Sequence, residues 1–122
     1  MLGGLGDGPR PTGNVCTPGT NIVMNGELIT QHCTNSSSPT FNGEEWVLFE
    51  LVVYGDSIIH HLVNGDTVLT YSKPQVGGGS IPEGYPVPVG TLISSGYIAL
   101  QAESSPFDFR KVELLDLSLG AN

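Results

Sequence analysis

The amino-acid sequence predicts an all-β protein folded as an antiparallel β-sandwich. Glycine and proline occur 17 and 9 times and interrupt nearly the whole chain, and no helical apolar stripe persists between them. Short apolar stretches instead alternate with turn-forming pairs, among them Asn25-Gly26 and Asn64-Gly65. Short strands with frequent turns are typical of β-sandwiches.

Length and composition predict a single domain over residues 1–122. A chain of 122 residues with 39% hydrophobic content can bury a core of its own. We expect an irregular lead-in over residues 1–19 and a Gly/Pro-rich loop over residues 73–90, because this density of glycine and proline excludes a central strand. The glycines at 77–79 lack the Gly-Lys-Ser/Thr ending of a phosphate-binding loop.

The first predicted hairpin joins residues 21–24 to residues 27–33. Its turn, Asn25-Gly26, suits the two-residue type I′ geometry because both residues tolerate positive φ.

The two cysteines are predicted to form a disulfide. In the register of this hairpin Cys33 faces Pro18 and lies one diagonal step from Cys16. A disulfide would indicate an oxidising compartment, and the alternative is two free thiols in a reducing one. A metal site that adds His32 is disfavoured, because neighbouring residues point to opposite faces of a strand.

A three-stranded meander is predicted over residues 46–54, 57–63 and 66–72. Its two turns are Gly55-Asp56 and Asn64-Gly65.

The first of these turns fixes the most specific catalytic candidate. A two-residue turn places Tyr54 opposite Ser57, and therefore Glu50 opposite His61 on one face of the sheet. A carboxylate and an imidazole would then be neighbours. The alternative is an ordinary cross-strand pair on a solvated face.

The two faces of the meander differ in character. The expected core face carries Val47, Phe49, Leu51, Val53, Ile58, His60, Leu62, Leu69 and Tyr71. The expected mixed face carries Trp46, Leu48, Glu50, Val52, Ile59, His61, Val63, Val68 and Thr70. His60 is expected to be a hydrogen-bonded core histidine, and Trp46 either a packing anchor or a platform for a sugar ring.

A last strand pair is predicted over residues 96–103 and 109–117. Alternation places Gln101 and Glu103 on one face, and Arg110 could pair with Glu103 across the turn. These groups either face a ligand or form a salt bridge that ties two strands together.

The net charge of −8, with only 4 lysines and arginines, excludes several partners. Nucleic acid and anionic membranes both require clustered cations. No apolar stretch approaches the length of a membrane-spanning helix, and residues 1–7 lack the pattern of a signal peptide. We expect no nucleic-acid partner and no membrane partner.

Several motifs resemble the 3-keto-disaccharide hydrolase domain family. They lie, in this order, at residues 10–20 (RPTGNVCTPGT), 43–46 (GEEW), 61–65 (HLVNG) and 96–103 (GYIALQAE), followed by Phe109-Arg110. The resemblance extends from about Pro9 to Leu117. It implies a concanavalin A-like jelly roll of two curved antiparallel sheets, in proteins that are commonly exported and act on oxidised glycosides.

This chain departs from the family pattern at its beginning. Members carry a substantial segment ahead of the Arg-Pro-Thr-Gly stretch, and here Met1 lies just upstream of it. About seven strands are predicted, whereas a complete double-sheet jelly roll needs at least eight. Because unpaired edges favour association, we expect a homodimer or larger assembly, located outside the cytoplasm in an extracellular or periplasmic space.

The resemblance implies cleavage of a 3-keto-glycoside by abstraction of the C2 proton. Glu103 or His61 would be the base or acid, and Glu50 would orient His61. Gln101 and Arg110 would bind the keto oxygen or stabilise the enolate. No metal and no cofactor is expected.

A carbohydrate ligand is expected in either of two functional classes. A non-catalytic carbohydrate-binding module would need only Trp46, Tyr97 and hydrogen-bonding side chains, and an inactive truncated domain is a further alternative. The Glu-x-Asp-x-x-Glu motif of glucanases does not occur in this sequence, which disfavours ordinary retaining glycoside hydrolysis.

Overall fold

The computed structural model describes residues 3–4, 6, 8–102 and 105–118. Within these residues it contains seven strands and no helix. The strands are β1 (Val15–Cys16), β2 (Thr20–Met24), β3 (Glu27–Ile29), β4 (Cys33–Thr34), β5 (Phe49–Tyr54), β6 (Ile58–Val63) and β7 (Asp66–Val76).

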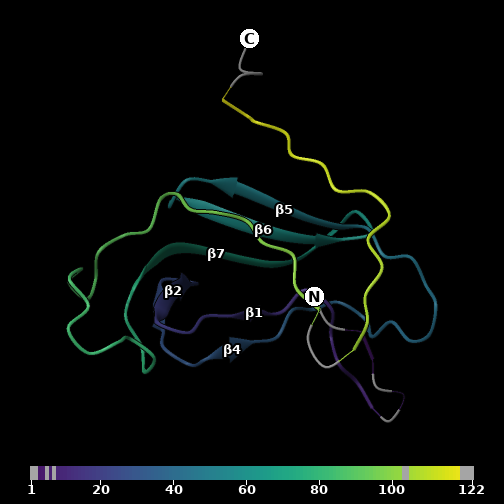
Figure 1. Ribbon diagram of the computed structural model, residues 1–122, viewed down its shortest axis with the longest axis horizontal. Coiled ribbons are helices and arrows are strands. Elements are labelled where there is room, and N and C mark those ends of the chain that lie inside the picture. Colours follow the sequence, from purple (N-terminus) through teal and green to yellow (C-terminus); the bar gives the residue numbers. More distant parts are fainter. Residues whose placement is uncertain (1–2, 5, 7, 103–104, 119–122) are drawn as a thin grey trace.

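The strands form two antiparallel sheets. The larger sheet has five strands in the order β3-β2-β7-β6-β5, and β1 pairs with β4 in a separate two-stranded ribbon. Figure 1 shows β5, β6 and β7 side by side, with the β1–β4 ribbon as a second layer beneath them. The predicted all-β, antiparallel sandwich is confirmed.

The Asn-Gly turns have the geometry that their sequence predicts. Asn25 and Gly26 have φ of 52° and 78°, and Met24 pairs with Glu27. Asn64 and Gly65 repeat this arrangement with φ of 49° and 88°. Two consecutive residues in the left-handed region are the mark of a type I′ hairpin.

The turn between β5 and β6 contains three residues, and the predicted two-residue turn is wrong. Tyr54 pairs with Ile58 instead of Ser57. The backbone N–H and the hydroxyl of Ser57 both donate to the carbonyl oxygen of Tyr54, at 3.0 and 2.7 Å. These two bonds keep Ser57 inside the turn and move β6 by one residue.

This shift exchanges the two faces of β6, because successive residues of a strand point to opposite sides. Ile59, His61 and Val63 face the interior together with Phe49, Leu51 and Val53, their partners in β5. Ile58, His60 and Leu62, which were predicted in the core, lie on the outer face.

The core lies between the five-stranded sheet and the segments that cover its inner face. Its buried apolar residues are Ile22, Ile59, Val63, Val68, Leu69 and Val76. Buried polar residues accompany them, namely Thr12, Asn21, Ser36, Ser38 and His61.

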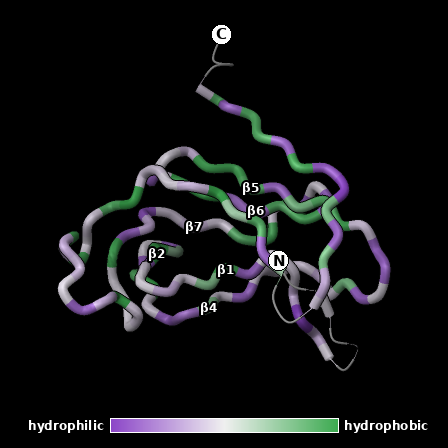
Figure 2. The backbone as a smooth tube through the Cα atoms, in the orientation of Figure 1, coloured by the Kyte–Doolittle hydropathy of each residue, from purple (hydrophilic) through white to green (hydrophobic). Residues whose placement is uncertain are grey.

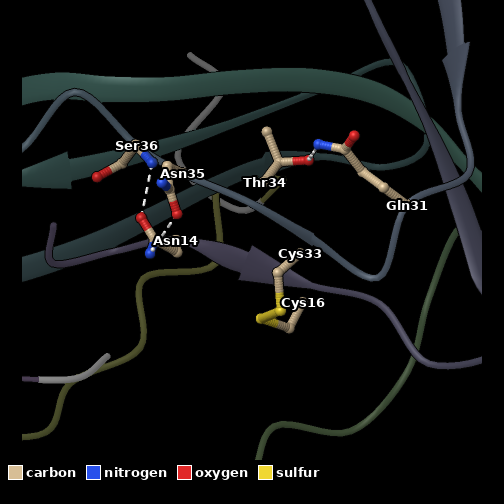
Figure 3. Close-up of a disulfide and its surroundings, with 7 residues drawn as sticks. All are labelled: Asn14, Cys16, Gln31, Cys33, Thr34, Asn35 and Ser36. Atoms are coloured by element: carbon tan, nitrogen blue, oxygen red, sulfur yellow. Dashed lines mark hydrogen bonds between the residues drawn. A yellow bond between two sulfur atoms is a disulfide. The ribbon is translucent and has the colours of Figure 1, made fainter. Parts of the chain in front are cut away.

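Cys16 and Cys33 form the predicted disulfide (Figure 3). They lie directly opposite each other in the β1–β4 ribbon, so the expected pairing of Cys33 with Pro18 is wrong. The N–H of Thr17 donates to the carbonyl oxygen of His32 at 2.7 Å. Beside the ribbon, Asn14 bonds to both Asn35 and Ser36.

The Gly/Pro-rich region begins later than expected. Strand β7 continues to Val76, and the following loop returns to it. The N–H of Val76 donates to the carbonyl oxygen of Thr91, and the N–H of Ile93 donates to that of Pro74. Strand β1 likewise lies within the lead-in that was expected to be irregular.

The C-terminal segment, residues 94–118, forms no strand in its described part, so the predicted hairpin over residues 96–103 and 109–117 is wrong. Nearly all of its described residues are exposed. Figure 2 shows hydrophobic and hydrophilic residues alternating along residues 105–118. The segment therefore has the sequence pattern of strands but no sheet to join.

Candidate functional site

His61 occupies the inner face of β6 and is only 5% exposed. Its Nδ1 lies 2.7 Å from the carbonyl oxygen of Gly13. Because a carbonyl oxygen only accepts, Nδ1 carries the hydrogen, and Nε2 accepts from the Tyr71 hydroxyl at 2.9 Å. The rings of Phe49 and Tyr71 contact the imidazole edge-on.

Burial keeps this pair of side chains uncharged. It lowers the pKa of His61, an effect that the hydrogen bond to Gly13 partly opposes. Burial also raises the pKa of Tyr71 to about 12. With both ring nitrogens bonded inside the protein, His61 has the environment of a structural residue.

The Arg-Pro-Thr-Gly-Asn stretch brings the Gly13 carbonyl to His61. Gly13 has a φ of +82°, and a Cβ at this position would lie 3.0 Å from Cε2 of Phe49, so both backbone conformation and space favour glycine. The Ser36 hydroxyl donates to the carbonyl oxygen of Thr12 at 2.6 Å. This stretch therefore covers the inner face of β5 and β6.

The outer face carries a second set of polar groups, Glu50, His60 and Thr70. His60 Nδ1 lies 2.9 Å from Thr70 Oγ1. Glu50 pairs in register with Leu62, and His60 pairs with Val52, so Glu50 and His60 are diagonal neighbours on one face. The predicted pairing of Glu50 with His61 is wrong, and the carboxylate's imidazole neighbour on this face is His60.

An open groove of about 430 Å³ lies between the β2–β3 turn, residues 35–37 and residues 67–70, and it shares only Thr70 with this face. Neutral side chains line it, namely those of Met24, Asn25, Asn35, Ser36, Ser37, Thr67, Val68, Leu69 and Thr70. Amides and hydroxyls at this density match the hydroxyl groups of a sugar, and the absence of charge in the lining favours a neutral ligand.

A family model described as the 3-keto-alpha-glucoside-1,2-lyase-like domain matches residues 2–115. The chain belongs to this family. Its members are carbohydrate-active domains, which agrees with the resemblance of the sequence motifs. No curated protein and no solved structure matches the chain.

Two of the predicted site residues, Trp46 and Arg110, lie in contact. The guanidinium of Arg110 lies 5.3 Å from the ring centre of Trp46, within the range of a cation–π interaction. Trp46 is 56% exposed, so part of its ring remains open to a ligand.

The other predicted site residues lie on the C-terminal segment. Tyr97 and Gln101 are exposed. Glu103 lies outside the described residues, as does its predicted pairing with Arg110.

Two site residues were missed in the sequence, His60 and Thr70. Residues 58–63 read Ile-Ile-His-His-Leu-Val, so each face of β6 presents an apolar residue, a histidine and an apolar residue. Hydrophobicity cannot choose between these faces, and only the length of the turn before β6 decides. The sequence did not indicate that the turn around Ser57 contains three residues, and this turn length decides which face of β6 is buried.

A second, smaller hollow of about 220 Å³ lies at the far end of β7, lined by Pro18, Gly19, Thr20, Val76, Ser80, Ile81, Pro82, Tyr85 and Ile93. It contains none of the predicted site residues. In the described part of the chain no three histidine, cysteine or acidic side chains are grouped to hold a metal ion. Nor does any helix there have the length and apolarity needed to cross a membrane.

Proposed function

We propose that this domain cleaves the C1 glycosidic bond of 3-keto-glycosides, at a site on the outer face of β5 and β6. One observation carries the proposal: Glu50 and His60 are diagonal neighbours on one accessible face of the sheet. Membership of the lyase-like family supports this choice of substrate class.

The chemistry requires a base, an acid and a group that stabilises an enolate. The ketone at C3 acidifies the C2 proton, so a base removes it and the electron pair moves onto the keto oxygen. Collapse of the enolate forms a C1–C2 double bond and expels the oxygen at C1, which takes up a proton. Addition of water across this double bond then gives the hydrolysis product.

The outer face offers groups suited to the two proton transfers. The Glu50 carboxylate takes the C2 proton, and His60 donates a proton to the departing oxygen. The Thr70 hydroxyl can either donate to or accept from Nδ1, so it supports His60 before and after it gives up its proton. Histidine exchanges protons readily near neutral pH, as this step requires.

Sugar and enolate recognition are assigned to the remaining predicted residues. Trp46 supports the sugar ring, and Arg110, held against it, stabilises the negative charge on the keto oxygen. Gln101 would bind the keto oxygen and Tyr97 the sugar, as expected from the sequence.

Turnover of an aryl 3-keto-glucoside tests this proposal directly. Glu50→Gln and His60→Gln should each lower kcat/KM about 100-fold or more, the usual effect of removing a general acid or base. His32→Gln is the matched control, because His32 is an exposed histidine away from the site, and it should retain full turnover. Unchanged turnover in both site variants would refute the assignment.

Binding without catalysis is the second candidate function, and the uncharged lining of the groove favours it. A binding module would take up unoxidised glucan and leave the 3-keto-glucoside intact. Calorimetric titration with both sugars separates the two functions, and Asn35→Ala should weaken binding in either case. A wild-type protein that neither binds nor cleaves these sugars would contradict both.

We also propose that the protein works outside the cytoplasm. The Cys16–Cys33 disulfide supports this, because such bonds persist in oxidising compartments. Fractionation of producing cells tests the location, and recovery of the protein in the reduced form from the cytoplasm alone would refute it.

A further inference from the structure

We infer that two copies of this chain exchange their C-terminal segments, each segment adding a strand to the free edge of β5 in the other copy.

The segment over residues 94–118 leaves an unusual amount of apolar surface in water. Tyr97 is fully exposed, and the exposed fractions of Ile98, Leu114 and Leu115 are 74%, 82% and 78%. No described residue between 94 and 117 forms a backbone hydrogen bond with a strand. Exposed apolar surface of this extent marks an interaction site in a soluble protein.

Strand β5 offers the complementary edge. It pairs with β6 on one side and with no strand on the other within the described chain. Leu51 and Val53 face the interior but are 47% and 44% exposed, whereas Ile59 and Val63 beside them are 6% and 2% exposed. The inner face of the sheet therefore continues uncovered beyond β5.

The lengths and patterns of the two surfaces match. Residues 111–117 form a stretch of seven residues, and β5 has six. Val112 and Leu114 are two positions apart, as are Leu51 and Val53, so in a paired strand they would extend the same apolar face of the sheet. Pairing would also satisfy the unpaired backbone groups of both segments.

In its own chain the segment passes β5 without joining it. It is held at its start, where Ile93 bonds to Pro74 beside the β5–β6 turn, and again where Arg110 contacts Trp46, ahead of β5. Figure 1 shows the last part of the described chain, in yellow, extending away from the sheet. This molecule has both an unpaired strand-like segment and an unpaired sheet edge. The backbone groups of both can form hydrogen bonds when two copies exchange segments about a two-fold axis.

Charge also favours this pairing. Arg110 and Lys111 are two of the four cationic side chains in a chain of net charge −8. Glu44, Glu45 and Glu50 lie on or just before β5. Exchange brings two cations of one copy against a second anionic copy, where they offset repulsion between the two molecules.

Molar mass from light scattering between 1 and 100 µM tests the exchange. The wild type should have the mass of two chains. Leu114→Lys should be monomeric, whereas Leu28→Lys, a control on the exposed face of β3 at the opposite sheet edge, should remain a dimer. A wild type that is monomeric throughout, or that grows into longer oligomers, would overturn the inference.

Engineered cysteines identify the contact. Leu51→Cys and Leu114→Cys, mixed as separate chains, should form a disulfide between copies, while the native cysteines stay paired. The double variant carries both cysteines, Leu51→Cys and Leu114→Cys, in one chain. If its two new cysteines bond within a single chain, and the mixed single variants form no bond, the segment pairs with β5 of its own chain. That result would refute the exchange. These readouts do not depend on turnover, so an inactive dimer would refute only the proposed function.

Discussion

His60 and His61 are adjacent in the chain but lie on opposite faces of β6, in environments that suit different tasks. His61 is buried, bonded through both ring nitrogens and packed between two aromatic rings. His60 is half-buried and bonds to a single exposed threonine. A one-residue register thus decides which histidine supports the fold and which can meet a ligand.

Of the changes predicted here, replacing His61 should cause the largest loss of stability. His61→Ala removes two buried hydrogen bonds and leaves a cavity, so we expect the free energy of unfolding to fall by about 3 kcal/mol. His60→Ala should change it by less than about 1 kcal/mol, since exposed substitutions usually have small effects. Urea denaturation of both variants measures the difference, and equal losses would contradict the assignment of the two faces.

The partner of His61 allows a milder test. Tyr71→Phe keeps the ring and removes the hydroxyl, which leaves Nε2 of His61 without its donor. The expected loss is about 1–2 kcal/mol of unfolding free energy. Tyr54→Phe, whose ring is 53% exposed, is the control and should be neutral. A neutral Tyr71→Phe would show that the hydroxyl adds nothing to the interior.

Of these changes, a change of pH near neutrality should have the smallest effect on stability. The pKa of His61 is lowered by burial, so below about pH 6.5 the unfolded chain binds a proton that the folded chain resists. Stability should therefore fall as the pH drops through 6.5 towards the lowered pKa. In alkali it should fall again between pH 10 and about 12, because the folded protein retains the Tyr71 proton.

Thermal unfolding across this pH range measures both slopes. His61→Gln should lose the acid component and Tyr71→Phe the alkaline one. Acid and alkaline slopes that survive these substitutions would assign the titration to other groups.

Local sequence was sufficient for the turns and insufficient for the register. Asn25-Gly26 and Asn64-Gly65 adopt the predicted conformation because the preference for positive φ belongs to these residues themselves. The faces of β6 could not be predicted, because its repeated residue pairs make both faces equally apolar. The register follows from the three-residue turn, which two hydrogen bonds of Ser57 close.

The C-terminal segment shows that a strand-like sequence pattern does not by itself predict a strand. Its alternation is that of two strands, and the hairpin expected from it is absent. A strand is stable only when another strand satisfies its backbone groups, and the alternating sequence does not say whether such a neighbour is present. Gln101 and Arg110 were therefore found as candidates, but their position relative to Glu50 could not be predicted.

The disulfide has a consequence for the covalent layout of the molecule. It closes residues 16–33 into a ring, and this ring passes through both layers, since β1 and β4 belong to the ribbon and β2 and β3 to the large sheet. The exposed Asn25-Gly26 turn is part of the ring. A single cut of the backbone at that turn would leave two fragments still linked by the sulfur–sulfur bond, so a nicked molecule would separate only after reduction.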